Sequence, residues 1–226
     1  VRYIPDDLYV SKIDPYFNNR ETQIGVCDKN YFDLWFKDAN MPRTIARMIN
    51  GVFFDKNYKI ITKEDVIKLL EKENAFVLKP CLGSCGGENV SFHENKNLKE
   101  IIKLLDKLPS NNVIFQEPIQ QHKILSDIHK ESVNSLRIMT LQLNNKIHYL
   151  QGVLRMGVGN SKVDNAMSGG IYCGINLDGS LKNKAFDLYG KEFSKHPQGY
   201  VFKDTVIPGY EKAVEMVKKE AEKMAH

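Results

Sequence analysis

The spacing of apolar and polar positions divides the middle of the chain into short strands and helices. Apolar residues follow strand periodicity at 58–61, 75–78, 89–92 and 113–116, and helical periodicity at 63–73 and 97–108. Thr62 stands directly before the first helical run and is a typical N-cap. The order β-α-β-β-α-β over 58–116 predicts a compact α+β lobe.

The segment before this lobe is less regular. Residues 1–27 contain Pro5 and Pro15 among polar turns and predict no regular element. Five large apolar side chains within 29–38 predict one short helix, which ends before Pro42.

The second half of the chain has strand periodicity instead. Two long alternating runs, 135–143 and 146–156, are joined by the tight turn Asn144-Asn145. Two shorter runs, 170–176 and 180–188, follow, and Pro208 then opens a final amphipathic helix. These runs predict a mainly antiparallel meander.

A lobe boundary is expected between these two halves. Pro118 directly follows the last strand of the first half and cannot continue a strand ladder. The predicted organisation is an N-terminal segment over 1–27, a small lobe over 28–116 and a large lobe over 117–226.

The stretch 75–92 joins two predicted strands through a glycine-rich loop that holds Gly83, Ser84, Gly86 and Gly87. Glycine allows backbone N–H groups to turn toward one point, and Lys79 at the end of the first strand adds a cation. This combination suits a phosphate-like anion, although a plain hairpin with an exposed lysine explains the loop as well. A P-loop and a Rossmann fingerprint are excluded, because no Gly-Lys-Ser/Thr and no helix follow the glycines.

Composition and charge limit the classes of partner. The 226 residues are 42% hydrophobic and 27% charged, which is ordinary for a globular chain that buries a core. The net charge of +4 is spread without a basic block, so no nucleic-acid partner is expected. No run reaches the length of a membrane span and no signal peptide is visible, so we expect no membrane span and a cytoplasmic location. Nothing in the pattern predicts an oligomeric state.

The four cysteines are Cys27, Cys81, Cys85 and Cys173. The Cys-x3-Cys pair could hold zinc, but no matching second pair follows it. Reduced thiols are therefore the better interpretation.

Several polar residues occupy unusual positions in the strand-rich half. Arg137 lies inside an apolar strand and Arg155 near the end of its neighbour, either as surface residues or as planar donors to phosphate or carboxylate. The loop 157–170 contains Asp164 and Asn165 with two adjacent glycines, which suits magnesium or is an ordinary surface loop.

The order of these motifs resembles the ATP-grasp superfamily. The matching stretches are 76–90, 113–119, 132–141 and 153–176. The block Val-Asp-Asn…Gly-Gly, with His196-Pro197 and Ile207-Pro208 downstream and 28–54 upstream, is most similar to bacterial sugar-transfer-associated and polysaccharide-biosynthesis ATP-grasp proteins. The resemblance implies two α+β lobes with the nucleotide site between them, the second lobe being mainly an antiparallel sheet.

The resemblance also implies roles for individual residues. The lysine that contacts the phosphates would be Lys79. The loop that closes over the phosphates would contain Ser84, Gly86 and Gly87, and the hinge that contacts adenine and ribose would consist of Gln116, Glu117 and Ile119. Arg137 and Arg155 would face the transferred phosphate and an acyl phosphate, and Asn165 with Asp164 would hold phosphate, metal or acceptor.

The reaction implied is activation of a carboxylate by ATP and Mg²⁺, followed by attack of an amine or hydroxyl. Its substrate would be a small-molecule or glycan-linked carboxylate or amine in polysaccharide or small-metabolite biosynthesis. A nucleotide-binding module without ligase activity and an ATP-dependent phosphotransferase are the alternatives. Relatives continue past such a final helix into strands with an Asp and a Glu-x-Asn that hold magnesium. We therefore expect a large lobe without these metal-binding strands.

Overall fold

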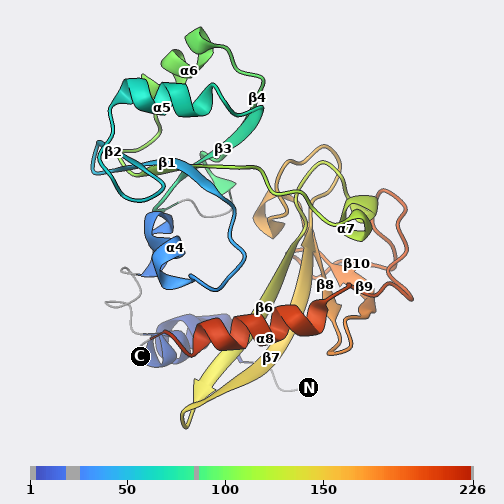
Figure 1. Ribbon diagram of the computed structural model, residues 1–226. Coiled ribbons are helices and arrows are strands. Elements are labelled where there is room, and N and C mark those ends of the chain that lie inside the picture. The colour runs from blue at the N-terminus through green and yellow to red at the C-terminus, as the bar shows by residue number, and fades with distance from the viewer. Residues whose placement is uncertain (1–3, 19–25, 84–86, 225–226) are drawn as a thin grey trace. The chain divides into compact units, whose positions relative to one another are not determined.

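The computed structural model describes residues 4–18, 26–83 and 87–224 (Figure 1). Contacts group the chain into two compact units. The first unit comprises residues up to 84, 89–117 and 224–226, and the second comprises 85–88 and 118–223. Each unit is built on one five-stranded sheet whose paired strands all run antiparallel. The α+β class predicted from the sequence is therefore confirmed.

The sheet of the first unit has the strand order β2-β1-β5-β3-β4. Its strands are β1 (Thr44–Ile49), β2 (Val52–Asp55), β3 (Ala75–Pro80), β4 (Ser91–Glu94) and β5 (Val113–Gln116). Two helices, α5 (Lys63–Leu70) and α6 (Leu98–Leu105), lie together on one side of it (Figure 1). The predicted hairpin around the glycine loop is confirmed by the antiparallel pairing of β3 with β4.

Local sequence determines where these two helices begin. Thr62 accepts a hydrogen bond from the Asp65 N–H while the Asp65 carboxylate accepts from the Thr62 N–H. Asn97 and Glu100 form the same reciprocal capping box at α6. Each box satisfies N–H groups that a helix terminus otherwise leaves without partners.

The core of the first unit lies between this helix pair and one face of the sheet. Phe76 and Leu78 of β3 point into it, together with Phe115 of β5 and Val66 of α5. Successive strand residues alternate between faces, so Val77 and Lys79 point to the opposite face. That opposite face carries the polar residues considered below.

Two sequence predictions in the first unit are wrong. The strand predicted at 58–61 is a turn, in which Tyr58 has φ +63° and Ile60 makes only an isolated bridge to Phe54. The edge strand is β2 instead. The single helix predicted at 29–38 is a 3-10 turn, η2 (Lys29–Tyr31), followed by one turn of α4 (Phe32–Trp35).

The N-terminal segment contains short helical pieces where the sequence predicted no regular element. These are α1 (Asp6–Leu8), the π-helical η1 (Tyr9–Ile13) and α2 (Asp14–Phe17). None of the described side chains in η1 or α2 is buried.

The second unit contains the predicted meander, with strand order β10-β9-β8-β7-β6. Its strands are β6 (Ser135–Leu143), β7 (Lys146–Met156), β8 (Ile171–Ile175), β9 (Leu181–Phe186) and β10 (Glu192–Phe193). Its helices are α7 (Lys123–Ile128), the 3-10 turn η4 (Ala166–Ser168) and α8 (Tyr210–Ala221). The long strands β6 and β7 have the predicted ends, and α7 and β10 were not predicted.

Helix α8 covers one face of this sheet and runs along β6 and β7 (Figure 1). Tyr210 and Val214 pack there against Leu154 and Cys173 in the core. A Cβ at Gly152 would lie 1.7 Å from the Tyr210 hydroxyl oxygen, so the helix approaches the strand closely at this glycine. The predicted arginines lie on the other face of the sheet.

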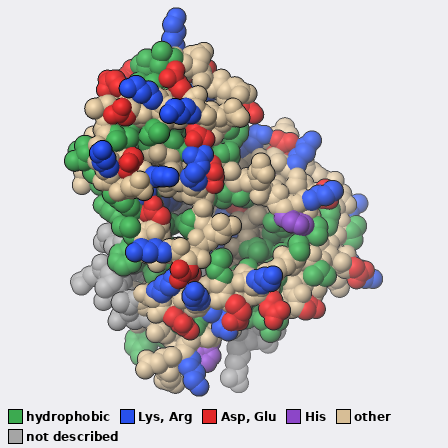
Figure 2. All heavy atoms as spheres, viewed as in Figure 1, with side chains coloured by type: hydrophobic (Ala, Val, Ile, Leu, Met, Phe, Trp, Pro, Cys, Tyr) green, Lys and Arg blue, Asp and Glu red, His purple; other side chains and the backbone are tan. Residues whose placement is uncertain are grey.

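The surface of each unit is mixed in charge. Basic and acidic side chains are interspersed over the visible face in Figure 2. Within the part of the chain that the structure describes, no helix combines the length and apolar character needed to cross a membrane. Cys27 is exposed and Cys81 and Cys173 are buried free thiols, whereas Cys85 lies outside the described residues.

Candidate functional site

Lys79 and Gln116 meet on the polar face of the first sheet. Lys79 of β3 pairs with Ile114 of β5 and is diagonal to Gln116, so all three side chains share one face. Lys79 Nζ donates to Gln116 Oε1 over 3.1 Å, and Gln116 Nε2 donates to the Pro42 carbonyl over 3.4 Å. The structure therefore brings together two of the residues predicted to bind nucleotide.

The surroundings of Lys79 favour binding of an anion. Burial lowers the pKa of Lys79, and the charge of Lys29 lowers it further. Among the described residues, no carboxylate lies within ion-pair distance of Lys79 Nζ. A half-buried ammonium with a neutral amide partner remains uncompensated, and a phosphate would supply the missing charge.

Glu117 directs its carboxylate to Arg43 within the first unit. Its oxygens accept from the Arg43 backbone N–H over 2.9 Å and from Arg43 Nε over 3.2 Å. The hydrogen bond from the Arg43 backbone lowers the pKa of Glu117, and the Arg43 side chain adds to this. Arg43 also holds Glu73 by a bidentate pair of 2.9 and 2.7 Å. The Glu117 N–H also donates to the Arg43 carbonyl over 3.0 Å, so both the carboxylate and the N–H of Glu117 are used by the protein.

The other predicted hinge and loop residues are only partly described. The side chain of Ile119 is 53% exposed, and its N–H has no protein acceptor in the described ranges. Gly83 and Gly87 have φ of +68° and +85°, which only glycine adopts readily. Ser84 and Gly86 lie outside the described residues.

Both predicted arginines lie on the face of the second sheet opposite helix α8. Ser135 of β6 pairs with Arg155 of β7, and Arg137 pairs with Val153, so the two arginines are diagonal neighbours on one face. Arg137 is exposed, and its guanidinium has no ion-pair or hydrogen-bond partner among the described residues. It is therefore available to an external anion.

Asp164 ties its loop to both of these strands. One carboxylate oxygen accepts from the Ser135 N–H over 3.1 Å and from the Ser135 hydroxyl, and the other accepts from Arg155 Nη2 over 3.2 Å. The carboxylate is only 16% exposed. These contacts use both oxygens, so Asp164 holds Arg155 and the loop in place.

Magnesium does not fit the donor set around Asp164. In the described ranges, no group of three or more His, Cys, Asp or Glu side chains is arranged to hold a metal ion. A magnesium ion bound by protein requires carboxylates with free lone pairs, and those of Asp164 already accept three hydrogen bonds. We therefore derive no step through a metal held by this chain.

Asn165 shapes the loop in which it lies. Its side-chain oxygen accepts from the Met167 N–H over 3.3 Å and caps η4, and its carbonyl accepts from the Ser168 and Gly170 N–H groups over 3.0 Å each. A Cβ at Gly170 would come within 2.9 Å of three backbone carbonyl oxygens, so the backbone packs too closely there for a side chain. The loop is compact, and the amide nitrogen of Asn165 has no partner among the described residues.

Lys182 is a third cation on the same face, which the sequence analysis missed. Gly174 pairs with Val153 and shares the face of Arg137 and Arg155. A Cβ at Gly174 would meet Cδ of Lys182 at 2.8 Å, so the lysine stem crosses the sheet over this glycine. Lys182 precedes two other polar residues in β9 and looks like part of a solvated edge strand. Its position on this face depends on the bulge that shifts the register of β9 against β8, which the sequence pattern does not indicate.

Two buried histidines hold the beginning of the loop that carries Asp164. His129 and His196 are 2% and 0% exposed, and their ring centres lie 5.6 Å apart. Nε2 of His129 contacts the Gly159 carbonyl at 3.0 Å, and Nε2 of His196 contacts the Gly157 carbonyl at 2.8 Å. In both histidines, Nδ1 accepts a hydrogen bond from a backbone N–H. The ring proton is therefore on Nε2, which donates to the carbonyl.

Each unit thus presents, on one sheet face, a cation that has no carboxylate partner among the described residues. In the first unit this cation is Lys79, and in the second Arg137 lies beside the anchored Arg155. Guanidinium and ammonium groups of this kind bind phosphate oxygens and stabilise charge that develops during phosphoryl transfer.

Comparison with known proteins identifies one family. The model of the sugar-transfer associated ATP-grasp family matches residues 10–226. No match was found among curated proteins or among solved structures.

Proposed function

Because the chain belongs to the sugar-transfer associated ATP-grasp family, we propose that it is a ligase that activates a carboxylate with ATP as an acyl phosphate. Membership of this family supports an ATP-dependent, ligase-like activity in a sugar-transfer context. The substrate that we propose is a small-molecule or glycan-linked carboxylic acid, and the acceptor is an amine or a hydroxyl.

The nucleotide-binding part of the proposal rests on Lys79. Among the described residues, its ammonium has only the neutral oxygen of Gln116 as a partner, so phosphate oxygens would replace or join that amide. Gln116 would keep the lysine oriented, and the glycine loop would cover the phosphates. Since Arg43 holds both the carboxylate and the N–H of Glu117, the hinge would contact adenine through the Ile119 N–H.

The observation that carries the catalytic part is Arg137 on the same face as Arg155. In the proposed reaction, a carboxylate oxygen of the substrate attacks the γ-phosphorus and the bond to ADP breaks. The acceptor then attacks the acyl carbon, and inorganic phosphate leaves with the electron pair of the broken C–O bond. Arg137 would stabilise the transferred phosphoryl group, with Arg155 and Lys182 beside it.

Magnesium enters this proposal only with the nucleotide, where it neutralises phosphate charge. The residues of this chain would orient the carboxylate and the phosphoryl group. The compact loop at Asn165 would place an amide donor close to Arg155.

The test traps the acyl phosphate with hydroxylamine. The protein is incubated with ATP, Mg²⁺ and a panel of carboxylic acids that includes uronic acids and amino acids. We expect ADP, phosphate and a hydroxamate in equal amounts with at least one acid. ADP together with a phosphorylated acceptor and no phosphate would indicate a phosphotransferase, and nucleotide binding without ADP release would indicate a binding module.

Substitution of Arg137 tests the role of the second sheet. Arg137→Ala removes a cation that would act on the transferred phosphoryl group, so we expect turnover to fall by about 10²-fold. ATP affinity should change little, because Lys79 is intact. Lys146→Ala removes an exposed cation at the far end of β7 and serves as the control. Full activity of Arg137→Ala would exclude the proposed role.

A further inference from the structure

A cavity in the first unit has no part in the proposed reaction. Residues of the segment 33–44 and of the turn at Lys56-Asn57 line an open cavity of about 410 Å³. This volume is within the range of pockets that bind small molecules. Of the described residues predicted to bind nucleotide, none lines this cavity.

One wall of the cavity is fixed by a buried ion pair. Arg47 is completely buried, and its guanidinium pairs with both oxygens of Asp33 and lies 4.0 Å over the ring of Tyr58. The Tyr58 hydroxyl also contacts Asp33. Burial would raise the pKa of Asp33, but the hydrogen bonds from Arg47 and Tyr58 outweigh it and the pKa is lowered. Asp33 is therefore ionised and neutralised within the protein.

The arginine at the opposite end of the lining faces two carboxylates, one more than its own charge balances. Arg43 pairs with Glu73 and with Glu117. The other charged residues of the lining are Lys37 and Lys56. Both are exposed, and neither has an ion-pair partner among the described residues. The lining and its ion-pair partners together hold four cations and three carboxylates, so their net charge is positive.

The rest of the lining combines apolar and amide groups. Phe36, Met41 and Pro42 supply apolar surface, and Asn40 and Asn57 supply amide donors and acceptors. Such a mixture suits a small molecule that carries hydroxyl groups on a carbon frame in addition to its charge. We propose that this cavity is a binding site for a phosphate or carboxylate group on a small polyhydroxylated molecule, held by Lys37 and Lys56 independently of the nucleotide.

Isothermal titration calorimetry at low salt tests the proposal. The probes are glucose 6-phosphate and glucuronate, with glucose as the uncharged control. At least one anion should bind, and glucose should bind at least about tenfold more weakly, because it lacks the group that the lysines hold. Pro42 and Arg43 of the lining contact Gln116 and Glu117, but Lys37 and Lys56 have no hydrogen bond or ion pair to a described residue predicted to bind nucleotide. Saturating ATP should therefore leave the affinity unchanged. Comparison of the two anions shows whether phosphate or carboxylate is preferred.

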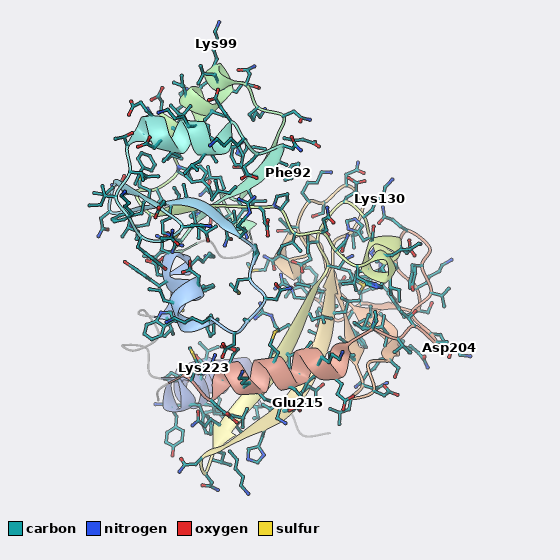
Figure 3. The ribbon with its side chains drawn as sticks, in the orientation of Figure 1. Phe92, Lys99, Lys130, Asp204, Glu215 and Lys223 are labelled. Carbon is teal, nitrogen blue, oxygen red and sulfur yellow. The ribbon has the colours of Figure 1, made fainter. Side chains whose placement is uncertain are left out.

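A double substitution assigns the binding to the two lysines. Lys37→Ala with Lys56→Ala should weaken binding of the anion by about tenfold. Lys99→Ala with Lys103→Ala is the matched control, because both are exposed lysines on α6, and Lys99 projects away from the sheet in Figure 3. Since all four side chains are exposed, the melting temperatures without ligand should agree.

Each of the remaining outcomes would overturn the site. These are no binding of either anion, equal binding of glucose, unchanged affinity in the cavity variant, or competition by ATP. Competition by ATP would mean that the cavity belongs to the nucleotide site. Hydroxamate formation is measured separately, so failure of this inference leaves the proposed ligase reaction standing.

Discussion

Lys79 lies half-buried beside a neutral amide, so its uncompensated charge is available to an anion. Lys79→Ala should weaken ATP binding by roughly 10- to 100-fold, which corresponds to the loss of one charge-assisted hydrogen bond. Titration calorimetry measures the change, with Lys99→Ala as a control on the far side of the unit. An ATP affinity equal to that of the unchanged chain would remove Lys79 from the site.

Asp164 distinguishes an anchoring role from a metal-binding one. Asp164→Ala leaves Ser135 and Arg155 without their acceptor, so the free energy of unfolding should fall by about 2 kcal/mol. Urea denaturation measures this loss. The magnesium concentration that half-saturates ATP turnover should stay the same, because the carboxylate is already used by its protein partners. A large rise in that concentration without loss of stability would instead make Asp164 a metal ligand.

At the scale of elements, the sequence predicts the second sheet better than the first. The strands β6 and β7 end at the predicted residues because their side chains alternate and because Asn144 and Asn145 adopt the positive φ of a tight hairpin turn. Strand β1 escaped prediction because Arg47 interrupts its apolar run. That arginine is buried only because Asp33, distant in sequence, neutralises it.

The candidate site likewise contains residues that the sequence indicated and residues that it did not. Arg137 and Arg155 were picked out because each is a charged residue within an apolar strand pattern, and Lys79 because it ends the strand before the glycine loop. Gln116 was named through the family resemblance. Lys182 and the two histidines were not, because their places depend on strand register and on contacts over long sequence separations. The local periodicity of one segment does not determine the strand register or these long-range contacts.

The loop from Gly157 to Gly170 should respond to pH through His196, which contacts the Gly157 carbonyl. Burial lowers the pKa of His196 below the ordinary value of about 6.5, and the neighbouring His129 adds to this, although the Gly157 carbonyl opposes it. The unfolded chain therefore binds a proton at a higher pH than the folded chain. Stability is fully present above pH 6.5 and is lost as the pH falls below it.

Urea denaturation between pH 7.5 and 5.5 measures this dependence. In His196→Gln, the pH-dependent contribution of His196 to stability should disappear. The plot of the free energy of unfolding against pH should therefore be flatter, and also lower. His148→Gln replaces an exposed histidine of β7 and is the matched control. His93 also has a lowered pKa from burial, so only the difference between variants reports on His196. Parallel curves for His196→Gln and the unchanged chain would contradict the assignment.

At the scale of the whole molecule, family membership predicts that ATP stabilises the folded chain. A ligand that binds only the folded state raises the free energy of unfolding, by about 2.7 kcal/mol at a concentration 100 times its Kd. ATP should therefore raise the melting temperature, and more so with Mg²⁺, which neutralises phosphate charge. Lys79→Ala should lose most of this rise, whereas Lys99→Ala should keep it. If ATP leaves the melting temperature of the unchanged chain where it was, with and without Mg²⁺, then Lys79 and the glycine loop form only a structural hairpin and the ligase proposal fails with them.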